Sequence, residues 1–432
     1  MLLGAYRGSI AANAALIAEY ITTPEAHGWS DGNTDLQNTA AFNAAIDDAS
    51  AHAGSSSTGR GVVELVQGKT YTVRVASNGS SSSSPVNALT AKSNSEIRTA
   101  GKPTRASGNQ AAIKWHSWAG FGTASICHRN LLWVSEISNF HCTHLQFHGN
   151  KNTLPSNSTV DYTKGTDGGM GCLSMRVSIS DVTFKEVDIQ HAITDCLLFS
   201  CDATTNVLFE DCNFTRGRRQ GMSMGRNNTS GGPHDSIVFR RCRFEQSGDH
   251  PGDIEGLQPG YGVDIEPDLT NRHVYGVTFD DCDFYENHGS LWFRDTQTTG
   301  SLFGHGLGID CRATLARLKV INCRGTLNST RGISCGIRSS AEWDDIYIEN
   351  FVSSQNGDNG MNVSASGSDI GGRITNMTMI NCDISIVRWE DDAFPNPWDT
   401  GWSVTIWKGN FNLSVSNPDN VQTVTVNNGF PP

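Results

Sequence analysis

The sequence predicts an all-β fold, a solenoid of short strands, and this prediction rests on two repeated phrases and on the composition. In the first phrase a cysteine lies between two phenylalanines, as in residues 209–214, 239–244 and 279–284, with weaker copies up to residue 382. Repeats spaced by a few tens of residues are typical of solenoids, and strand-rich repeats without helical periodicity predict a β-solenoid. We therefore expect one long domain.

The second phrase is a short apolar strand, usually opened by glycine, that follows each cysteine-like position by about ten residues. Its copies begin at Gly221, Gly262, Gly332 and Gly360. Two strands per repeat are thus expected in register. The copy at Gly262 comes late because a polar stretch, residues 246–260, is inserted before it. We expect function where the repeat is interrupted in this way.

The composition limits the classes of protein that fit. The chain has 45 glycines and only 18% charged residues, so helix should be scarce. A net charge of -12 argues against a nucleic-acid partner, which would favour a basic surface. No run of eighteen apolar residues is present, and Arg7 and Glu19 interrupt the apolar N-terminal stretch. We therefore expect neither a membrane partner nor a clear signal peptide.

The twelve cysteines favour packing over disulfides or metal binding. Several of them recur at one position of the repeat, where a small apolar side chain would point into the core. The chain has no Cys-x-x-Cys pair and no His/Cys cluster with zinc-ligand spacing, so we expect no structural metal. The stacked positions are Cys212, Cys242, Cys282, Cys323 and Cys382.

The N-terminal part has a different pattern. Asn38 and Thr39 offer an N-cap, and apolar residues at helical spacing continue to Ala49, which predicts one amphipathic helix. Two strands are expected next, in residues 59–65 and 68–73, and a serine-rich loop around residues 80–84.

The succession of this helix, Gly61-Val62-Val63 and Gly68-Lys69-Thr70-Tyr71 resembles the opening of the pectate lyase-like right-handed parallel β-helix superfamily. The resemblance covers roughly residues 30–425 and implies a single-stranded right-handed parallel β-helix with an N-terminal capping helix. It divides the chain into an N-terminal segment, a capped β-helix and a C-terminal capping segment, which are residues 1–30, 31–388 and 389–432.

The same superfamily includes pectate and alginate lyases, polygalacturonases, alginate epimerases and phage tailspike depolymerases. The resemblance therefore implies action on a polysaccharide but leaves the reaction open. It also implies an extracellular or virion-associated protein. As in the tailspikes, a homotrimer is the candidate assembly, and as in the lyases, Ca²⁺ is the candidate cofactor; otherwise we expect none.

A pair of carboxylates is the first candidate for chemistry. Strand alternation in residues 262–267 sends Val263 and Ile265 into the core and places Asp264 and Glu266 together on the exposed outer face. Residues two apart on a strand are about 6 to 7 Å apart, near the lower end of the roughly 6.5 to 9.5 Å separation in inverting glycosidases. Their like charges should raise one pKa and so separate an acid from a base. This favours hydrolysis of a polysaccharide.

Neighbouring coils should complete a groove around the pair. In-register stacking places Ser223 and Gly225 on one side, and Trp292, which suits a sugar ring, with Arg294 on the other. Arginines are dense between residues 216 and 243, which favours an anionic glycan. Further rim candidates are Arg218, Arg219, Tyr261 and His288, together with His250 and Asp253 of the inserted loop.

Two alternatives to hydrolysis stay open. Tyr261-Gly262-Val263-Asp264 is similar to the motif of alginate epimerases and lyases, whose tyrosine and histidine handle the C5 proton of a uronate. The histidine expected after the aspartate is absent here, and His288 is the candidate substitute. β-Elimination with Tyr261, His288 or Arg219 as proton-transfer groups is one alternative, and a non-catalytic tailspike or adhesin that binds a glycan is the other. A partial match to the polygalacturonase motifs is set aside, because Asp280 should lie on a different sheet from Asp264.

Overall fold

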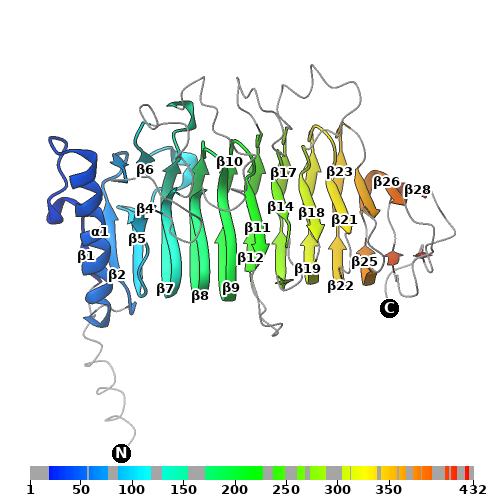
Figure 1. Cartoon of the computed structure of the whole chain (residues 1–432), viewed down its shortest axis with the longest axis horizontal. Helices are drawn as coiled ribbons and strands as arrows, with labels where there is room; N and C mark the ends of the chain where they lie inside the picture. Colours follow the sequence, from blue (N-terminus) through cyan, green and yellow to red (C-terminus); the bar gives the residue numbers. More distant parts are fainter. Residues whose placement is uncertain are drawn as a thin grey trace, which may run out of the picture.

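The computed structural model describes residues 19–55, 58–75, 86–117, 129–153, 171–226, 237–248, 260–267, 273–288, 304–311, 313–337, 342–357, 360–365, 373–380, 382–391, 404–407, 410–415 and 424–427. The chain is a right-handed parallel β-helix, as the sequence predicted. Its coils stack side by side from the N-terminal helix to the C-terminal strands (Figure 1).

The helix α1 (Asp35–Ala51) covers the N-terminal end of the solenoid. Its N-cap is Thr34, whose side chain accepts from the backbone N–H of Gln37 while Gln37 caps Thr34 in return. The helix therefore begins earlier than the Asn38 and Thr39 cap that the sequence suggested. Phe42 and Ile46 are fully buried against the first coil. Short 3-10 helices are η1 (Glu25–His27), η2 (Ala53–Ser55), η3 (Arg105–Ser107) and η4 (Lys151–Thr153).

Each coil passes through three faces, and every described strand pairing is parallel. The first face contains β1 (Tyr20–Thr22), β2 (Gly61–Leu65), β5 (Ser95–Thr99), β12 (Ile237–Arg240), β15 (Val274–Tyr275), β16 (Val277–Asp280), β19 (Thr314–Ile321), β22 (Glu342–Glu349), β25 (Arg373–Ile380), β27 (Val404–Trp407) and β29 (Val424–Asn427). The second contains β3 (Thr70–Val73), β6 (Ala111–Trp115), β10 (Asn213–Thr215), β13 (Arg243–Glu245), β17 (Asp283–Tyr285), β20 (Arg324–Thr326) and β23 (Val352–Ser354).

The third face contains β4 (Val86–Thr90), β11 (Met222–Arg226), β14 (Val263–Ile265), β18 (Leu307–Cys311), β21 (Ile333–Ile337) and β24 (Met361–Ala365). Five strands turn corners and contribute to more than one face: β7 (Arg129–His148), β8 (Gly171–Gln190), β9 (Asp195–Glu210), β26 (Asp383–Asp391) and β28 (Asn410–Val415). Parallel pairing continues beyond residue 388 into β27, β28 and β29.

The repeated phenylalanine–cysteine phrase contains two strands where the sequence suggested one. A single residue with positive φ turns the chain between them, for example Asp211 at 55° and Asn322 at 55°. Asp and Asn tolerate this left-handed conformation better than most residues. Arg241 adopts it at 51°, and Asp211 of the preceding coil holds its guanidinium at 2.7 and 2.9 Å.

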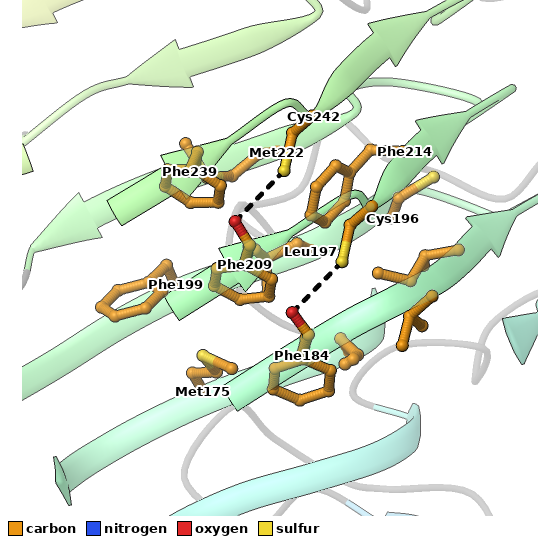
Figure 2. Close-up of a cluster of buried hydrophobic side chains, with 14 of the residues drawn as sticks. Met175, Phe184, Cys196, Leu197, Phe199, Phe209, Phe214, Met222, Phe239 and Cys242 are labelled. Carbon is orange, nitrogen blue, oxygen red and sulfur yellow. Dashed lines mark hydrogen bonds between the residues drawn. The ribbon is translucent and has the colours of Figure 1, made fainter. Parts of the chain in front are cut away.

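The core is a set of ladders that run along the solenoid axis. Phe184, Phe209 and Phe239 stack at centroid distances of 5.0 and 4.8 Å (Figure 2). The Cys242 thiol donates to the carbonyl of Phe209 at 3.4 Å. All described cysteines whose side chains are placed are free and buried, and these include Cys212, Cys242, Cys282, Cys323 and Cys382. The inward cysteine stack is confirmed.

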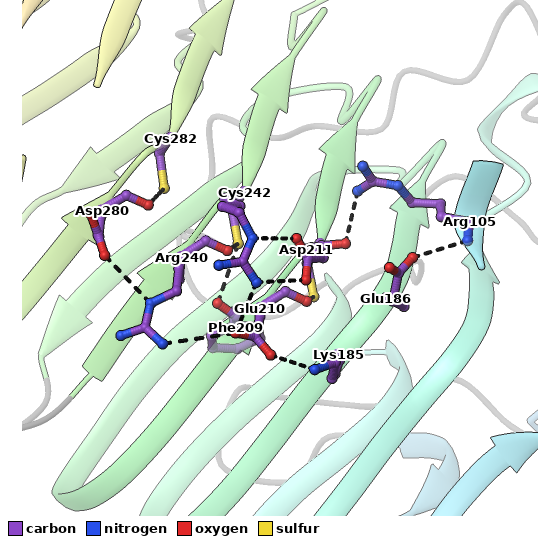
Figure 3. A network of polar contacts seen from close by, with 12 residues as sticks. Arg105, Lys185, Glu186, Phe209, Glu210, Asp211, Arg240, Cys242, Asp280 and Cys282 are labelled. Atoms are coloured by element: carbon purple, nitrogen blue, oxygen red, sulfur yellow. Dashed lines mark hydrogen bonds and ion pairs between the residues drawn. The ribbon is translucent and has the colours of Figure 1, made fainter. Parts of the chain in front are cut away.

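Polar ladders join the coils as well. On the outside, Lys185 pairs with Glu210 at 2.7 Å and Arg240 with Asp280 at 3.4 Å (Figure 3). Inside the corner between the second and third faces, asparagine side chains hydrogen-bond one another from coil to coil; Asn287 and Asn328 are buried and Asn356 is half-buried. Within the described ranges, no helix is long and apolar enough to span a membrane.

Candidate functional site

Asp264 lies on the third face, where the repeat is interrupted. Val263 and Ile265 are fully buried in the core, so Asp264 between them faces outward. The register places it between Ser223 of β11 and Gly308 of β18. The expected neighbour Ser223 is confirmed on one side. On the other side the structure has β18, where the sequence had suggested a strand around residues 290–294.

The expectation that Asp264 is exposed is wrong, because only 3% of it is accessible. Its Oδ2 accepts a short hydrogen bond from Nε2 of the buried Gln220. Its Oδ1 is buried and has no hydrogen-bond partner within the described part of the chain. Burial, and then the charge of Glu266, raise the pKa of Asp264 well above its ordinary value. The Asp264 carboxyl therefore holds its proton to a higher pH than an exposed aspartate does.

Four side chains form a row where the chain enters the third face: Gln220, Tyr261, His305 and Arg331. Backbone hydrogen bonds hold this row in register. The N–H groups of Gly221, Gly262 and Gly306 donate to the carbonyls of Tyr261, His305 and Arg331, respectively, at 2.9 to 3.0 Å. The rings of Tyr261 and His305 stack with centroids 4.7 Å apart and planes 16° apart. A phenol and an imidazole thus lie side by side at the entry to the face that carries Asp264.

Tyr261 extends over the neighbouring strand. A Cβ atom at Gly308 would lie 2.9 Å from Cδ2 of Tyr261, so the glycine leaves room for the ring. The Tyr261 hydroxyl makes no hydrogen bond to any described residue. Burial and the charges of Asp264 and Asp310 raise its pKa well above the ordinary value. Tyr261 therefore stays protonated and can donate.

His305 is buried, with 6% of its surface accessible. Its Nδ1 lies 2.5 Å from Oγ1 of Thr330 on the next coil. Burial and the charge of Arg331 lower the pKa of His305 to about 3, so the imidazole is neutral near pH 7. A neutral imidazole can accept a proton.

The two arginines before the row have structural contacts. Arg219 donates to the Asp195 carboxylate through two nitrogens, at 2.8 and 2.6 Å, and only 14% of its side chain is exposed. Arg218 is 7% exposed. Their predicted contact with substrate stays a prediction.

The remaining sequence-predicted residues are spread around this site. Glu266 is half-buried on the same strand edge as Asp264, and its N–H donates to the carbonyl of Met224 at 3.0 Å. The N–H of half-buried His288 donates to the carbonyl of Ser247 at the preceding corner. The histidine beside Tyr261 is His305 and not the expected His288. Outside the described residues lie Trp292, Arg294, His250 and Asp253, whose roles stay predictions.

Sequence reasoning missed His305 as a partner of Tyr261. The signal was present, because Gly306-Leu307-Gly308-Ile309 repeats the glycine-led phrase of Gly262-Val263-Asp264-Ile265. Aligning these two phrases places His305 directly beside Tyr261 and reveals a second insertion before it. Asp280 lies on β16 of the first face, away from Asp264.

In the part of the chain that the structure describes, no three His, Cys, Asp or Glu side chains are arranged to hold a metal ion. The inserted loop with His250 and Asp253 lies largely outside that part. A requirement for Ca²⁺ therefore stays a prediction.

Comparison with known proteins defines the class of fold. No protein-family model matches the sequence, and no curated protein matches it. Among solved structures, the A-module of mannuronan C-5 epimerase AlgE4 from Azotobacter vinelandii is similar, with a TM-score of 0.50 and 15% identity over 94% of this chain and 96% of the module.

PfbA, a surface adhesin of Streptococcus pneumoniae, has a TM-score of 0.50 and 10% identity over 94% of this chain and 89% of its own. A capsular polysaccharide depolymerase, the tailspike gp49 of Acinetobacter baumannii bacteriophage Fri1, has a TM-score of 0.45 and 17% identity over 94% of this chain and 63% of its own. The chain thus has a parallel β-helix fold similar to those of the AlgE4 module and PfbA. At these identities the likeness establishes the fold and leaves the activity open.

Proposed function

We propose that the chain is a polysaccharide lyase that cleaves an anionic, uronate-containing glycan by β-elimination on the third face. The observation that carries the proposal is the Tyr261–His305 stack, at 4.7 Å, at the entry to the face that carries the buried Asp264 carboxyl. Elimination at a uronate needs a base for the C5 proton, an acid for the leaving oxygen and a partner for the sugar carboxylate. These three side chains supply one group of each kind.

His305 fits the role of base. It is uncharged near pH 7, and its Nε2 makes no hydrogen bond to any described residue, while Nδ1 is engaged by Thr330. Nε2 takes the proton from C5, and the electron pair of that C–H bond forms the C4=C5 double bond as the C4–O4 bond breaks.

Tyr261 fits the role of acid. Its raised pKa keeps the phenol proton in place near neutral pH, so Tyr261 does not serve as a tyrosinate base. That proton passes to O4 of the departing sugar as the bond breaks. The departing fragment gains a new reducing end, and the other fragment begins with an unsaturated uronate. No water is consumed. A stack of the two rings lets them act on the same sugar unit.

Asp264 and Gln220 fit the role of carboxylate partner. The raised pKa of Asp264 gives it an O–H donor, and the Gln220 amide lies against it. A neutral donor that hydrogen-bonds the sugar carboxylate stabilises the negative charge that develops when C5 loses its proton. The cationic Arg331 at the end of the row favours an anionic polymer.

The names of the structural neighbours are consistent with this proposal. One is named as a mannuronan C-5 epimerase, which is an activity at C5 of a polymer. Another is named as an adhesin, so a glycan-binding protein without catalysis is an outcome that the experiment must detect.

Incubation with a panel of uronate-containing polysaccharides tests the proposal. Ultraviolet absorbance of the unsaturated product should rise together with new reducing ends. His305→Gln and Tyr261→Phe should each lower the rate by roughly 10² to 10⁴, as expected for loss of a general base or acid. His191→Gln is the matched control, because His191 also stacks on a ring, His148 at 4.6 Å, away from the site. Binding without either signal would contradict catalysis.

Hydrolysis by Asp264 and Glu266 is the second candidate, and the raised pKa of Asp264 supports it, because that pKa suits a general acid. Asp264→Asn separates the candidates. The amide keeps a neutral hydrogen-bond donor, so a lyase should retain much of its rate. A hydrolase would lose its acid and fall by roughly 10² to 10⁴. Reducing ends without ultraviolet absorbance would also favour hydrolysis.

A polymer substrate is consistent with an extracellular or virion-associated site of action, which remains part of the proposal. The homotrimer likewise remains a proposal, and light scattering on the purified chain measures it.

A further inference from the structure

Thr330 contacts the proposed base from the neighbouring coil. Its Oγ1 lies 2.5 Å from Nδ1 of His305, and both residues are 6% exposed. This is the only hydrogen bond of the His305 ring to a described residue. Because Nδ1 is occupied, Nε2 is the nitrogen left for a substrate.

The hydroxyl sits on a rigid turn between β20 and β21. The backbone N–H of Thr330 donates to the carbonyl of Gly304, next to His305, at 3.2 Å. Two residues earlier, Asn328 belongs to the asparagine ladder, where its Nδ2 donates to the carbonyl of Phe284 and to Oδ1 of Asn356, each at 3.0 Å. The turn after Thr330 is fixed too, since the N–H of Gly306 donates to the carbonyl of Arg331 at 2.9 Å.

We propose that Thr330 is a positioning residue that holds the proton of His305 on Nδ1 and so leaves the lone pair on Nε2 for proton abstraction. This inference rests on the proposed function of His305 as base. A neutral imidazole has two tautomers, and in the one proposed here Nδ1–H donates to Oγ1 of Thr330 while Nε2 carries the lone pair. The asparagine ladder transmits the rigidity of the coils to the hydroxyl. The asparagine ladder, which stabilises the stack of coils, thereby also supports proton abstraction by His305.

Two variants of one residue test this role. Thr330→Val keeps the shape and removes the hydroxyl, and Thr330→Ser keeps the hydroxyl. With a uronate polysaccharide as substrate, Thr330→Val should lower kcat by about 10- to 100-fold, the usual effect of removing a supporting hydrogen bond in a site, with KM little changed. Thr330→Ser should restore kcat. Thermal unfolding of both variants checks that the turn is intact.

A second measurement needs no substrate. Nitrogen NMR of histidine-labelled protein reports the protonated ring nitrogen of each imidazole, and comparison with His305→Gln identifies the His305 signals. Wild type and Thr330→Ser should show a protonated Nδ1, and Thr330→Val a mixture or the other tautomer. The same His305 signals in Thr330→Val and wild type would overturn the inference, as would a protonated Nε2 in wild type. Absence of cleavage by wild type would overturn the proposed function instead, and the spectrum would still decide the role of Thr330.

Discussion

Asp264 combines an outward direction with nearly complete burial, and this decides its charge. Gln220, Ser223 and Gly308 lie around it and only 3% of the residue is accessible, so water cannot solvate an ionised carboxylate there. Sequence alternation correctly predicted which face Asp264 occupies. It could not predict burial on that face, because burial depends on side chains from coils far apart in the sequence.

The buried carboxyl should make stability depend on pH. Because the pKa of Asp264 is raised in the folded state, its contribution to stability is present at acid pH and is lost as the pH rises through the raised pKa. Asp264→Asn removes this loss, so the variant should gain stability relative to wild type as the pH increases. Urea unfolding across a pH series measures the difference. Asp31→Asn, at a carboxylate that is 93% exposed, is the control. Parallel pH curves for wild type and Asp264→Asn would contradict a buried, neutral Asp264.

Gly308 should be required for activity through Tyr261. A methyl group at this position would lie 2.9 Å from the Tyr261 ring and displace it, and a misplacement of about 1 Å can cost roughly 10²-fold in rate. Gly308→Ala should therefore lower activity on a uronate polysaccharide strongly. Gly225→Ala is the matched control on the same face, because its nearest neighbour, the carbonyl of Glu266, is 4.0 Å away. Equal rates for both variants would mean that the ring position does not matter.

At the scale of elements, the repeated phrases predicted the strands and their register well. The glycine-led strands pair as expected, for example Met222 with Val263 and Ile333 with Met361. What they did not predict is the corner inside each phenylalanine–cysteine phrase. A single left-handed residue makes that corner, and the residue types there, Asp, Arg and Asn, give too weak a signal on their own.

Ion pairs between neighbouring coils should differ greatly in how much they contribute to the free energy of unfolding, depending on how buried they are. Arg219 and Arg324 each bind an aspartate of the preceding coil through two nitrogens. Arg219→Ala would remove the guanidinium that binds the buried Asp195 and should cost about 3 to 5 kcal/mol of unfolding free energy. Arg324 is 62% exposed, and Arg324→Ala should cost at most about 1 kcal/mol. Chemical denaturation of the two variants gives the comparison, and similar losses would show that burial of Asp195 is not the deciding factor.

At the scale of the whole molecule, the fold was predictable because a solenoid repeats its pattern, so each copy supports the next. The site was predictable only in part. The insertion before Tyr261 located the third face and Asp264, whereas the insertion before His305 went unrecognised and led to the wrong neighbouring strand. Contacts between coils such as Tyr261 with His305, and His305 with Thr330, depend on the lengths of both insertions and not on any local motif.

The most direct test of the central claim is digestion of a uronate polysaccharide in heavy water, followed by mass spectrometry and NMR of the products. Elimination through His305 and Tyr261 predicts an unsaturated uronate at the new chain end, with this product absent in His305→Gln. Hydrolysis would instead give saturated ends without deuterium at C5, and proton exchange without cleavage would give deuterium at C5 in an intact chain. Saturated ends, or an intact chain, would contradict the proposed lyase.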